Sequence, residues 1–306
     1  MKIAVLADIH ANLPALEAVI ADIERWRPDQ VVIAGDVINR GPRPLECLNL
    51  VLELVAQHEW LVLQGNHEEY VINRANPRRQ ETAAETEISR NALWTYWQLH
   101  RDVRALQVMP EQIELTGPDS RSLRFVHASM ISNRDGIYPD HQLSELRRLI
   151  APAPAVLCAG HTHRPVIHKV DNSLVVNVGS VGMPFDGDRR AAYARLTWRA
   201  GQWRSAVIRV RYDWQQTEQD FFQSGFLPNA GDLVRIMLHE FRQARPLLNS
   251  WTHAYYDDVL AGNISVAESV VRFMAQKGLS DPQPPPRQQS VTLAGWSPAA
   301  SAVAVD

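Results

Sequence analysis

The chain has 306 residues, enough for one large domain or for one domain with an appendage. It is 45% hydrophobic and 21% charged, as is typical of a globular protein, and its net charge of −3 is dispersed along the chain. This distribution gives no reason to expect stable nucleic-acid binding or attraction to an anionic membrane.

Cysteine usage and hydropathy indicate the compartment. Cys47 and Cys158 stand in apolar segments, which predicts buried thiols in a reducing environment rather than a disulfide framework. The first apolar run ends at Asp8 and is too short for a signal peptide, and no run of about 18 apolar residues follows. We therefore expect a cytoplasmic protein without a membrane segment.

Strands and helices are predicted to alternate at the start of the chain. Short apolar runs at 2–7, 31–34 and 60–63 predict buried strands. Pro14 suits the first turn of a helix after the first strand, and a second helix begins near Pro44. This alternation predicts a right-handed βαβα unit with a sheet covered on both faces.

The rest of the first 225 residues is predicted to complete the same domain. Residues 69–106 have a helical pattern and are interpreted as an insertion that caps the end of the sheet. A helix is predicted at 143–150. Further strands are predicted at 112–116, 123–126, 156–159, 166–169, 174–177, 192–198 and 203–211.

The chain changes character after Gly225. Residues 226–280 predict a helical extension, in which Ser265 opens a helix with a capping box and Gly278 closes it. The extension suits a lid, a partner arm or a contact between copies in a homo-oligomer. Residues 281–306 are rich in Pro, Gln and Ser and predict a disordered tail.

Polar fragments follow five of the predicted strands, at the point where each strand ends. Because ligands bind beyond the carboxyl ends of strands in open α/β sheets, we expect these fragments to converge. They are Asp8-Ile9-His10, Gly35-Asp36, Gly65-Asn66-His67-Glu68, His127 and Gly160-His161-Thr162-His163.

The residue types in these fragments predict a metal centre. Carboxylate, imidazole and amide groups suit borderline or hard divalent ions, and the absence of Cys argues against a thiolate site. The set is too large for one ion but suits two ions that share a carboxylate and clamp a phosphoryl group. The predicted ligands are Asp8, His10, Asp36, Asn66, His127, His161 and His163.

Several residues near these fragments have alternative interpretations. Asp8 alone suits a cap for the helix at Pro14, and Glu68 either orients His67 or opens the next helix. The loop with Asn177, Gly179 and Ser180 either lines the site with backbone N–H groups or forms a plain tight turn. Histidines outside the fragments are expected to be structural or on the surface, namely His58, His100, His141, His168, His239 and His253.

Together these motifs resemble the calcineurin-like metallophosphoesterase superfamily, and its small prokaryotic phosphodiesterase branch in particular. The similarity is carried by residues 8–18 (DIHANLPALEA), 126–129 (VHAS) and 177–182 (NVGSVG), and it extends over about 1–212. It implies an α/β fold, a four-layer αββα sandwich of two mixed β-sheets flanked by helices. The residues after this span form the C-terminal helical extension.

The resemblance also implies roles for individual residues. Asp36 bridges two divalent ions. Manganese is the expected metal, with iron, nickel, zinc or magnesium as alternatives. His67 stands near the leaving group, and Arg40 matches the phosphate-contacting arginine of related phosphoprotein phosphatases. The first ion takes Asp8, His10, Asp36 and His163, and the second takes Asp36, Asn66, His127 and His161.

One departure separates this chain from the phosphoprotein phosphatases. Those enzymes place an Asp where this chain has Asn39, and Asn39 can bind His67 but cannot stabilise its imidazolium by charge. The hypothesis is hydrolysis of a phosphodiester or phosphomonoester, in a small molecule or nucleotide, by in-line attack of a metal-bridging hydroxide. Alternatives are a dinucleoside polyphosphate hydrolase, a phosphoprotein phosphatase and a non-catalytic metal-binding scaffold.

Overall fold

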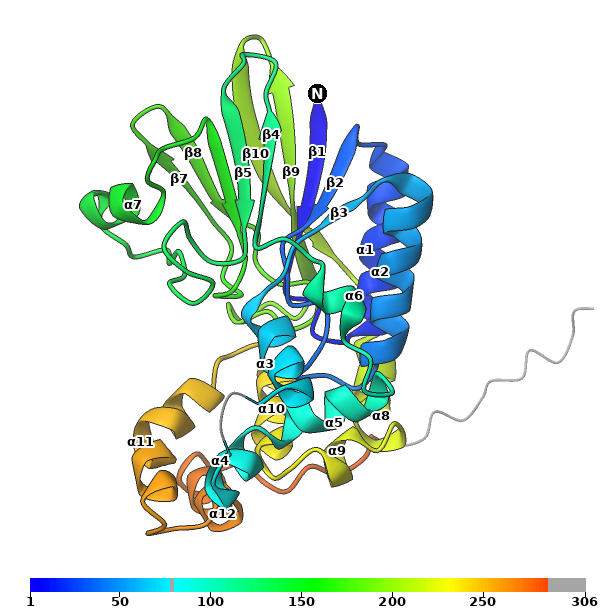
Figure 1. Cartoon of the computed structure of the whole chain (residues 1–306), viewed down its shortest axis with the longest axis vertical. Helices are drawn as coiled ribbons and strands as arrows, with labels where there is room; N and C mark the ends of the chain where they lie inside the picture. The colour runs from blue at the N-terminus through cyan, green and yellow to red at the C-terminus, as the bar shows by residue number, and fades with distance from the viewer. Residues whose placement is uncertain (78–79, 286–306) are drawn as a thin grey trace, which may run out of the picture.

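Two five-stranded mixed sheets lie face to face in the computed structural model, which describes residues 1–77 and 80–285 (Figure 1). The first sheet has the order β10-β9-β1-β2-β3, with β1, β2 and β3 parallel and β9 antiparallel to both of its neighbours. Its strands are β1 (Lys2–Leu6), β2 (Gln30–Ile33), β3 (Leu61–Val62), β9 (Ala191–Arg199) and β10 (Gln202–Val210).

The second sheet has the order β4-β5-β6-β8-β7. In its centre β5, β6 and β8 are parallel, while β4 and β7 are antiparallel edge strands. Its strands are β4 (Gln112–Thr116), β5 (Ser122–Val126), β6 (Val156–Ala159), β7 (Val166–Val170) and β8 (Ser173–Asn177).

The burial of strand β1 explains why its residues 3–6 are all apolar. Ile3 and Val5 face the second sheet, where they pack in a cluster with Phe125. Ala4 and Leu6 face the opposite way and pack under the helices on the outer surface. A strand buried on both faces has no position for a polar side chain, so the alternation of period two is absent.

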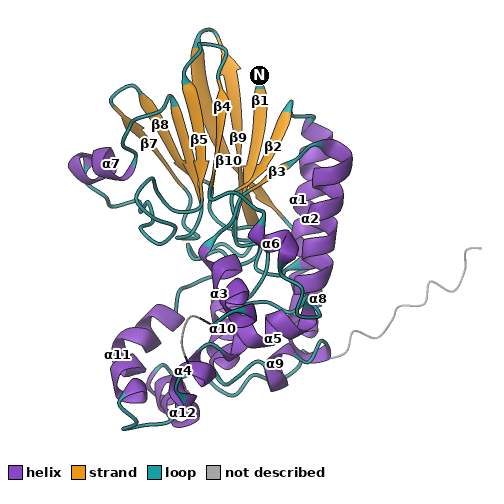
Figure 2. Cartoon of the chain, viewed as in Figure 1, coloured by secondary structure: helices purple, strands orange, loops and turns teal. Residues whose placement is uncertain are grey.

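Helices cover both outer faces of the sheet pair (Figure 2). Helices α1 (Leu13–Trp26) and α2 (Pro44–His58) pack on the first sheet, and α7 (Leu143–Leu149) packs on the second. The predicted α/β class and the two mixed sheets flanked by helices are confirmed. The side chain of Asn12 caps α1 by accepting a hydrogen bond from the Ala15 N–H (3.2 Å), so Asp8 is not the cap.

A second group of helices lies below the carboxyl ends of β1, β2 and β3 (Figure 1). The segment predicted as an insertion forms separate short helices, and Trp94 within it packs against Phe226 from the C-terminal part, at 4.8 Å between ring centres. The helices of this group are α3 (Asn66–Ala75), α4 (Ala83–Ile88), α5 (Arg90–Gln98), α6 (Arg104–Gln107), α8 (Trp214–Gln223), α9 (Phe226–Asn229), α10 (Leu233–Gln243), α11 (Leu248–Leu260) and α12 (Val266–Gln276).

The C-terminal helices begin earlier than the sequence pattern predicts. Helix α8 starts at Trp214, before Gly225, because the Asp213 side chain caps it by accepting from the Gln216 N–H (3.0 Å). The predicted cap of α12 is present, with Ser265 accepting from the Glu268 N–H (3.1 Å). Of the predicted tail, 281–285 have no helix or strand, and 286–306 lie outside the described residues.

Two simpler expectations concern the cysteines and the membrane. Cys47 and Cys158 are both buried free thiols, as predicted, and burial raises the pKa of each. Within residues 1–77 and 80–285, the helices are too short or too polar to cross a bilayer.

Candidate metal centre

The five predicted fragments meet at one edge of the sheets. Each follows the carboxyl end of a parallel strand: β1, β2 and β3 in the first sheet, and β5 and β6 in the second. Hydrogen bonds join the loops across the two sheets, since the His161 N–H donates to Asp8 Oδ2 at 2.8 Å. Side chains that are far apart in the sequence therefore share one buried site.

The backbone at five of the predicted ligands is in the left-handed region. This conformation is uncommon for residues other than glycine, and it tends to occur at functional sites, where the surrounding structure enforces it. The φ angles are 55° at Asp8, 47° at His10, 55° at Asp36, 68° at His161 and 57° at His163. The surrounding structure therefore enforces the same uncommon backbone conformation at five of the seven predicted ligands.

Two glycines allow the loops after β2 and β3 to touch. A Cβ atom on Gly35 (φ 86°) would lie 2.7 Å from the Gly65 nitrogen, and one on Gly65 would lie 2.1 Å from Asp36 Oδ1. Both contacts are too close for any side chain. The glycine that precedes Asp36 and the glycine that precedes Asn66 are therefore steric requirements of the site.

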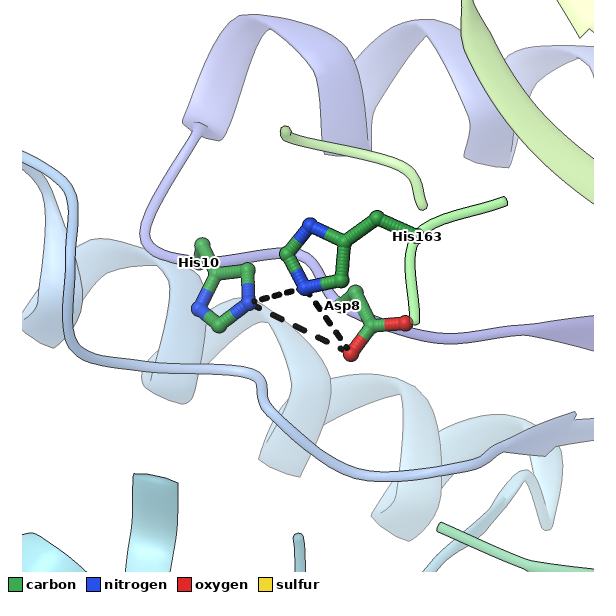
Figure 3. A group of neighbouring side chains, drawn as sticks. All are labelled: Asp8, His10 and His163. Atoms are coloured by element: carbon green, nitrogen blue, oxygen red, sulfur yellow. Dashed lines mark hydrogen bonds and ion pairs between the residues drawn. The ribbon is translucent and has the colours of Figure 1, made fainter. Parts of the chain in front are cut away.

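One half of the site is formed by Asp8, His10 and His163 (Figure 3). The Nε2 atoms of His10 and His163 are 3.0 Å apart, and they lie 4.0 and 3.6 Å from Asp8 Oδ1. Asp36 Oδ2 is 3.7 Å from His10 Nε2. One ligand atom from each of Asp8, His10 and His163 thus lies within 4.8 Å of the other two, as a shared cation requires.

Hydrogen bonds on the far side of each ring orient the two imidazoles. His10 Nδ1 lies 3.3 Å from the Asn39 carbonyl oxygen, and His163 Nδ1 lies 2.5 Å from the Met183 carbonyl oxygen. A carbonyl can only accept, so each Nδ1 carries the hydrogen, and each Nε2 presents a lone pair to the site.

The other half of the site is formed by Asp36, Asn66, His127 and His161. His127 Nε2 is 3.2 Å from Asp36 Oδ2 and 2.9 Å from Asn66 Oδ1, and His161 Nδ1 is 3.1 Å from the same Asn66 oxygen. His127 Nδ1 donates to the Ala34 carbonyl oxygen at 2.9 Å, which again leaves Nε2 facing the site. Burial lowers the pKa of His161 to about 4, so its ring is neutral.

The two carboxylates each use one oxygen for the backbone and leave the other for the site. Asp36 Oδ1 accepts from the His67 N–H at 2.9 Å, while Oδ2 lies between His10 and His127 and so faces both halves. Asp8 Oδ1 is buried and has no hydrogen-bond partner among the described residues. An unpaired buried carboxylate oxygen is costly, and a cation at this position would remove the cost.

Burial controls most protonation states here. It raises the pKa of Asp8 well above its usual value and lowers the pKa of His10 and His163 well below theirs. Burial opposes ionisation of Asp36 too, but His127 and other imidazoles hold its pKa well below the usual range. Asp36 in turn raises the pKa of His127 to about 10, against the effect of burial. His10, His161 and His163 are thus neutral nitrogen donors near the ionised Asp36, a set that fits divalent cations, whereas a cation at His127 would have to displace a proton.

His67 and Asn39 form a defined pair beside the first half of the site. The His67 ring packs edge-on against His10, at 4.9 Å between ring centres. Asn39 Oδ1 accepts from the Arg40 N–H at 2.9 Å, so the amide NH2 points to His67 Nδ1, also at 2.9 Å. Burial lowers the pKa of His67 to about 3. The ring is therefore neutral, accepts at Nδ1 and carries its hydrogen on Nε2.

Glu68 has a larger role than either sequence interpretation gave it. It stands in the first turn of α3 and is fully buried. Its carboxylate accepts from the N–H groups of Gly65 and Asp36 at 2.8 Å each, and from Val37 and Ile38 at 2.8 and 3.2 Å. Glu68 therefore holds the loop that carries Asp36, and no described hydrogen bond links its side chain to His67. The Gly-Asn-His-Glu run places an acid at the helix start, but the sequence around Glu68 does not indicate which loop its carboxylate binds.

The loop after β8 supports the site from behind. The Asn177 amide donates to the Gly160 carbonyl oxygen at 2.7 Å, and Ser180 Oγ donates to the Asp8 carbonyl oxygen at 2.8 Å. Both side chains are fully buried. Asn177 Oδ1 also accepts from the Gly179 N–H at 3.0 Å. These side chains therefore hold the loops that carry Asp8 and His161 in place. This role differs from both sequence interpretations, a loop that lines the site and a plain tight turn. Among the six other histidines, His239 is buried and contacts the Ser280 carbonyl oxygen.

Comparisons with known proteins agree with this architecture. Residues 1–201 match the family model of the calcineurin-like phosphoesterase superfamily domain. Uncharacterized protein MJ0912 of Methanocaldococcus jannaschii is 26% identical over 229 residues, which are 69% of this chain and 88% of that protein. The crystal structure of a metallophosphoesterase from Sphaerobacter thermophilus is similar, with a TM-score of 0.62 and 27% identity over 80% of this chain and 99% of that one.

A second solved structure shares the fold. It is the hypothetical protein PH1004 from Pyrococcus horikoshii OT3, with a TM-score of 0.65 and 20% identity over 76% of this chain and 97% of that one. The family match covers most of the chain and includes every loop of the candidate site. This chain belongs to the calcineurin-like phosphoesterase superfamily.

Proposed function

We propose that the protein is a metal-dependent phosphoesterase with a dinuclear centre, which hydrolyses a phosphodiester or a phosphomonoester. The observation that carries the proposal is the convergence of seven ligand-type side chains, with Asp36 Oδ2 near His10 Nε2 on one side and His127 Nε2 on the other. A single cation does not need so many donors, and a pair of cations that share one carboxylate does.

In this proposal the two groups hold one ion each. A pair of divalent ions supplies Lewis-acid activation of water and neutralises charge on a phosphoryl group. Manganese is the first candidate, and iron, nickel, zinc and magnesium are alternatives, because the donors are oxygen and imidazole nitrogen without thiolate. The first group is Asp8, His10, Asp36 and His163, and the second is Asp36, Asn66, His127 and His161.

His67 is proposed to act on the leaving oxygen. The Asn39 amide donates to its Nδ1, which places the ring hydrogen on Nε2 and leaves that atom as the donor. A neutral imidazole cannot deliver a proton as readily as an imidazolium, so this donor favours substrates whose leaving group needs only partial protonation. Arg40 is proposed to contact the phosphoryl oxygens with its permanent charge.

The pairing of Asn39 with His67 also bears on the alternatives. A phosphoprotein phosphatase of this superfamily places a carboxylate at this position, and here an amide stands there, which counts against that activity. Dinucleoside polyphosphates remain a candidate substrate class, since the guanidinium of Arg40 can bind the phosphoryl oxygens of either a phosphate ester or a phosphate anhydride. A non-catalytic scaffold is disfavoured, because a binding module has no need for a complete set of ligands.

Three substrates assayed side by side test the proposal. The metal-free protein is loaded with each divalent ion in turn and offered bis(p-nitrophenyl) phosphate, p-nitrophenyl phosphate and a dinucleoside tetraphosphate. We expect turnover that requires about two ions per chain, measured by elemental analysis, and that is lost in Asp36→Asn. A protein that binds two ions and cleaves none of the three contradicts the enzymatic proposal and supports the scaffold.

A further inference from the structure

An ion pair connects the candidate site to the C-terminal helices. Arg40, in the loop that follows Asp36, binds the carboxylate of Glu240 from α10. Both side chains are largely withdrawn from solvent, with exposed fractions of 11% for Arg40 and 1% for Glu240. Glu240 lies beyond residues 1–201, so this contact comes from outside the part of the chain that matches the family model.

Glu240 is itself held rigidly. Its Oε1 atom accepts from the backbone N–H groups of Leu247 and Leu248, at 2.8 Å each, where α11 begins. Its Oε2 atom is the one that binds Arg40. Because one oxygen is anchored to the backbone at a helix start, the other is a stationary acceptor for the guanidinium.

Arg40 lies close to the predicted ligands of the first ion. Its guanidinium carbon is 5.6 Å from the centre of the Phe185 ring, and Phe185 stacks on His163 at 4.4 Å between ring centres and 16° between planes. The charge of Arg40 is among the causes that lower the pKa of His10, His67 and His163, although burial is the largest cause for each. The guanidinium is therefore within electrostatic reach of three groups of the site.

One donor of Arg40 is still unpaired. The Nε atom is buried and has no hydrogen-bond partner among the described residues. Arginine binds tetrahedral anions with adjacent donors of its planar fork, so an arginine with one end held and another donor unpaired is prepared for such an anion. Without an anchor, a long side chain has to lose rotamer freedom each time it binds.

We propose that Glu240 is a positioning residue that holds the Arg40 guanidinium beside the metal centre, in the orientation that binds a phosphoryl oxygen. This inference rests on the proposed function, because it assumes a phosphoryl group at the site. In this arrangement the C-terminal helices contribute to the site, because Glu240 from α10 holds Arg40 in place before the substrate binds.

A double-mutant cycle in phosphate binding tests the inference. The variants are Glu240→Gln, Arg40→Ala and the two combined, and the measurement is the Kd of inorganic phosphate for the manganese-loaded protein by calorimetry. Glutamine keeps a carbonyl oxygen for the N–H groups of Leu247 and Leu248, and it replaces the charged acceptor of Arg40 by an amide NH2, which cannot accept from the guanidinium. We expect Glu240→Gln to weaken phosphate binding about tenfold and to have no further effect when Arg40 is already Ala.

The matched control is Asp220→Asn. Asp220 from α8 binds Arg43 at 2.6 Å, so it is a second ion pair between the C-terminal helices and the same loop, and Arg43 is not a predicted site residue. This variant should leave the phosphate Kd unchanged. If Asp220→Asn weakens binding as much as Glu240→Gln does, the effect is loss of docking and the positioning role is wrong.

Further outcomes separate this inference from the proposed function. An equal loss from Glu240→Gln in the wild-type and Arg40→Ala backgrounds overturns the inference, as does no loss in the wild type. If Glu240→Gln does not fold, Glu240→Asp keeps the charge but shortens the reach, and it should weaken phosphate binding only while Arg40 is present. A protein that binds phosphate with this coupling but hydrolyses no ester supports the inference and contradicts the proposed function.

Discussion

The Nε2 atoms of His10 and His163 lie 3.0 Å apart, although 153 residues separate the two histidines in the sequence. Each Nδ1 atom faces a backbone carbonyl oxygen, so both Nε2 atoms present lone pairs to one another. Two such lone pairs repel in a buried site unless a proton or a cation stands between them. The protein therefore holds this pair in an arrangement that a bound metal ion would stabilise.

Metal removal should accordingly destabilise the protein. A ligand that binds only the folded state, at a concentration of about a hundred times its Kd, contributes about 2.7 kcal/mol, which corresponds to roughly 4 °C in Tm for a chain of this size. We expect a chelator to lower Tm by this amount and re-added manganese to restore it, as measured by calorimetry. The Asp36→Asn variant is the control, since its Tm should not respond to the chelator. An unchanged Tm in the wild type contradicts a metal-stabilised site.

Asp36 and Asp8 should differ in what their loss removes. Asp36 Oδ2 lies 3.7 Å from His10 and 3.2 Å from His127, one residue of each proposed group, whereas Asp8 is proposed to bind the first ion alone. Elemental analysis should find about two ions per chain in the wild type, about one in Asp8→Asn and close to none in Asp36→Asn. Asp22→Asn, in a distant ion pair with Arg195, should keep both ions. Equal losses from Asp8→Asn and Asp36→Asn count against a bridging role.

Replacement of Glu68 by Gln should be costly although the two side chains have the same shape. The carboxylate accepts from four backbone N–H groups, and the amide NH2 turns a donor toward some of them. Burial raises the pKa of Glu68 to about 7, so at about pH 8, where the carboxylate is ionised, the loss of its charge-assisted bonds predicts a free energy of unfolding lower by roughly 2–4 kcal/mol. Urea unfolding of the metal-free protein measures it, with the exposed Glu17→Gln as a control that should change by less than about 0.5 kcal/mol. A change in the free energy of unfolding that is equally small in Glu68→Gln would contradict this role, since the Asp36 loop would then not depend on the Glu68 carboxylate.

His67→Ala should leave the metal content intact and slow turnover most on esters with poor leaving groups. The expected loss is roughly a hundredfold for an alkyl ester and less than tenfold for a p-nitrophenyl ester, because an activated leaving group needs little help from a proton donor. An equal loss of turnover on both esters would contradict the proposed role of His67 as the proton donor to the leaving oxygen.

The matched variant at Asn39 tests the protonation of the same ring. In Asn39→Asp, a carboxylate replaces the amide that faces His67 Nδ1, so the pKa of His67 rises and the imidazolium is stabilised. Because the wild-type ring is already neutral above about pH 3, a new fall in activity on the alkaline side should appear in Asn39→Asp, where the imidazolium loses its proton. A pH profile of kcat that is identical in the wild type and in Asn39→Asp contradicts this link.

Much of the domain could be predicted from local signals. The run before Asp8 is apolar at every position because β1 is buried on both faces, and such runs identify central strands. The polar fragments were found because each directly follows such a run. Helix α8 was missed because its buried face includes Thr217, Glu218 and Asp220, so the helix lacks the apolar stripe by which a buried face is identified.

The identity of the predicted ligands and their order along the chain were therefore determined by the sequence alone: short polar groups at strand ends have few other uses. Which atoms face one another was decided only by tertiary structure. The grip of Glu68 on the Asp36 loop, the tautomer of His67 and the reach of Glu240 to Arg40 depend on contacts between segments up to 200 residues apart. No local pattern encodes such contacts, because they arise when the sheets and helices pack and bring distant loops within hydrogen-bond distance.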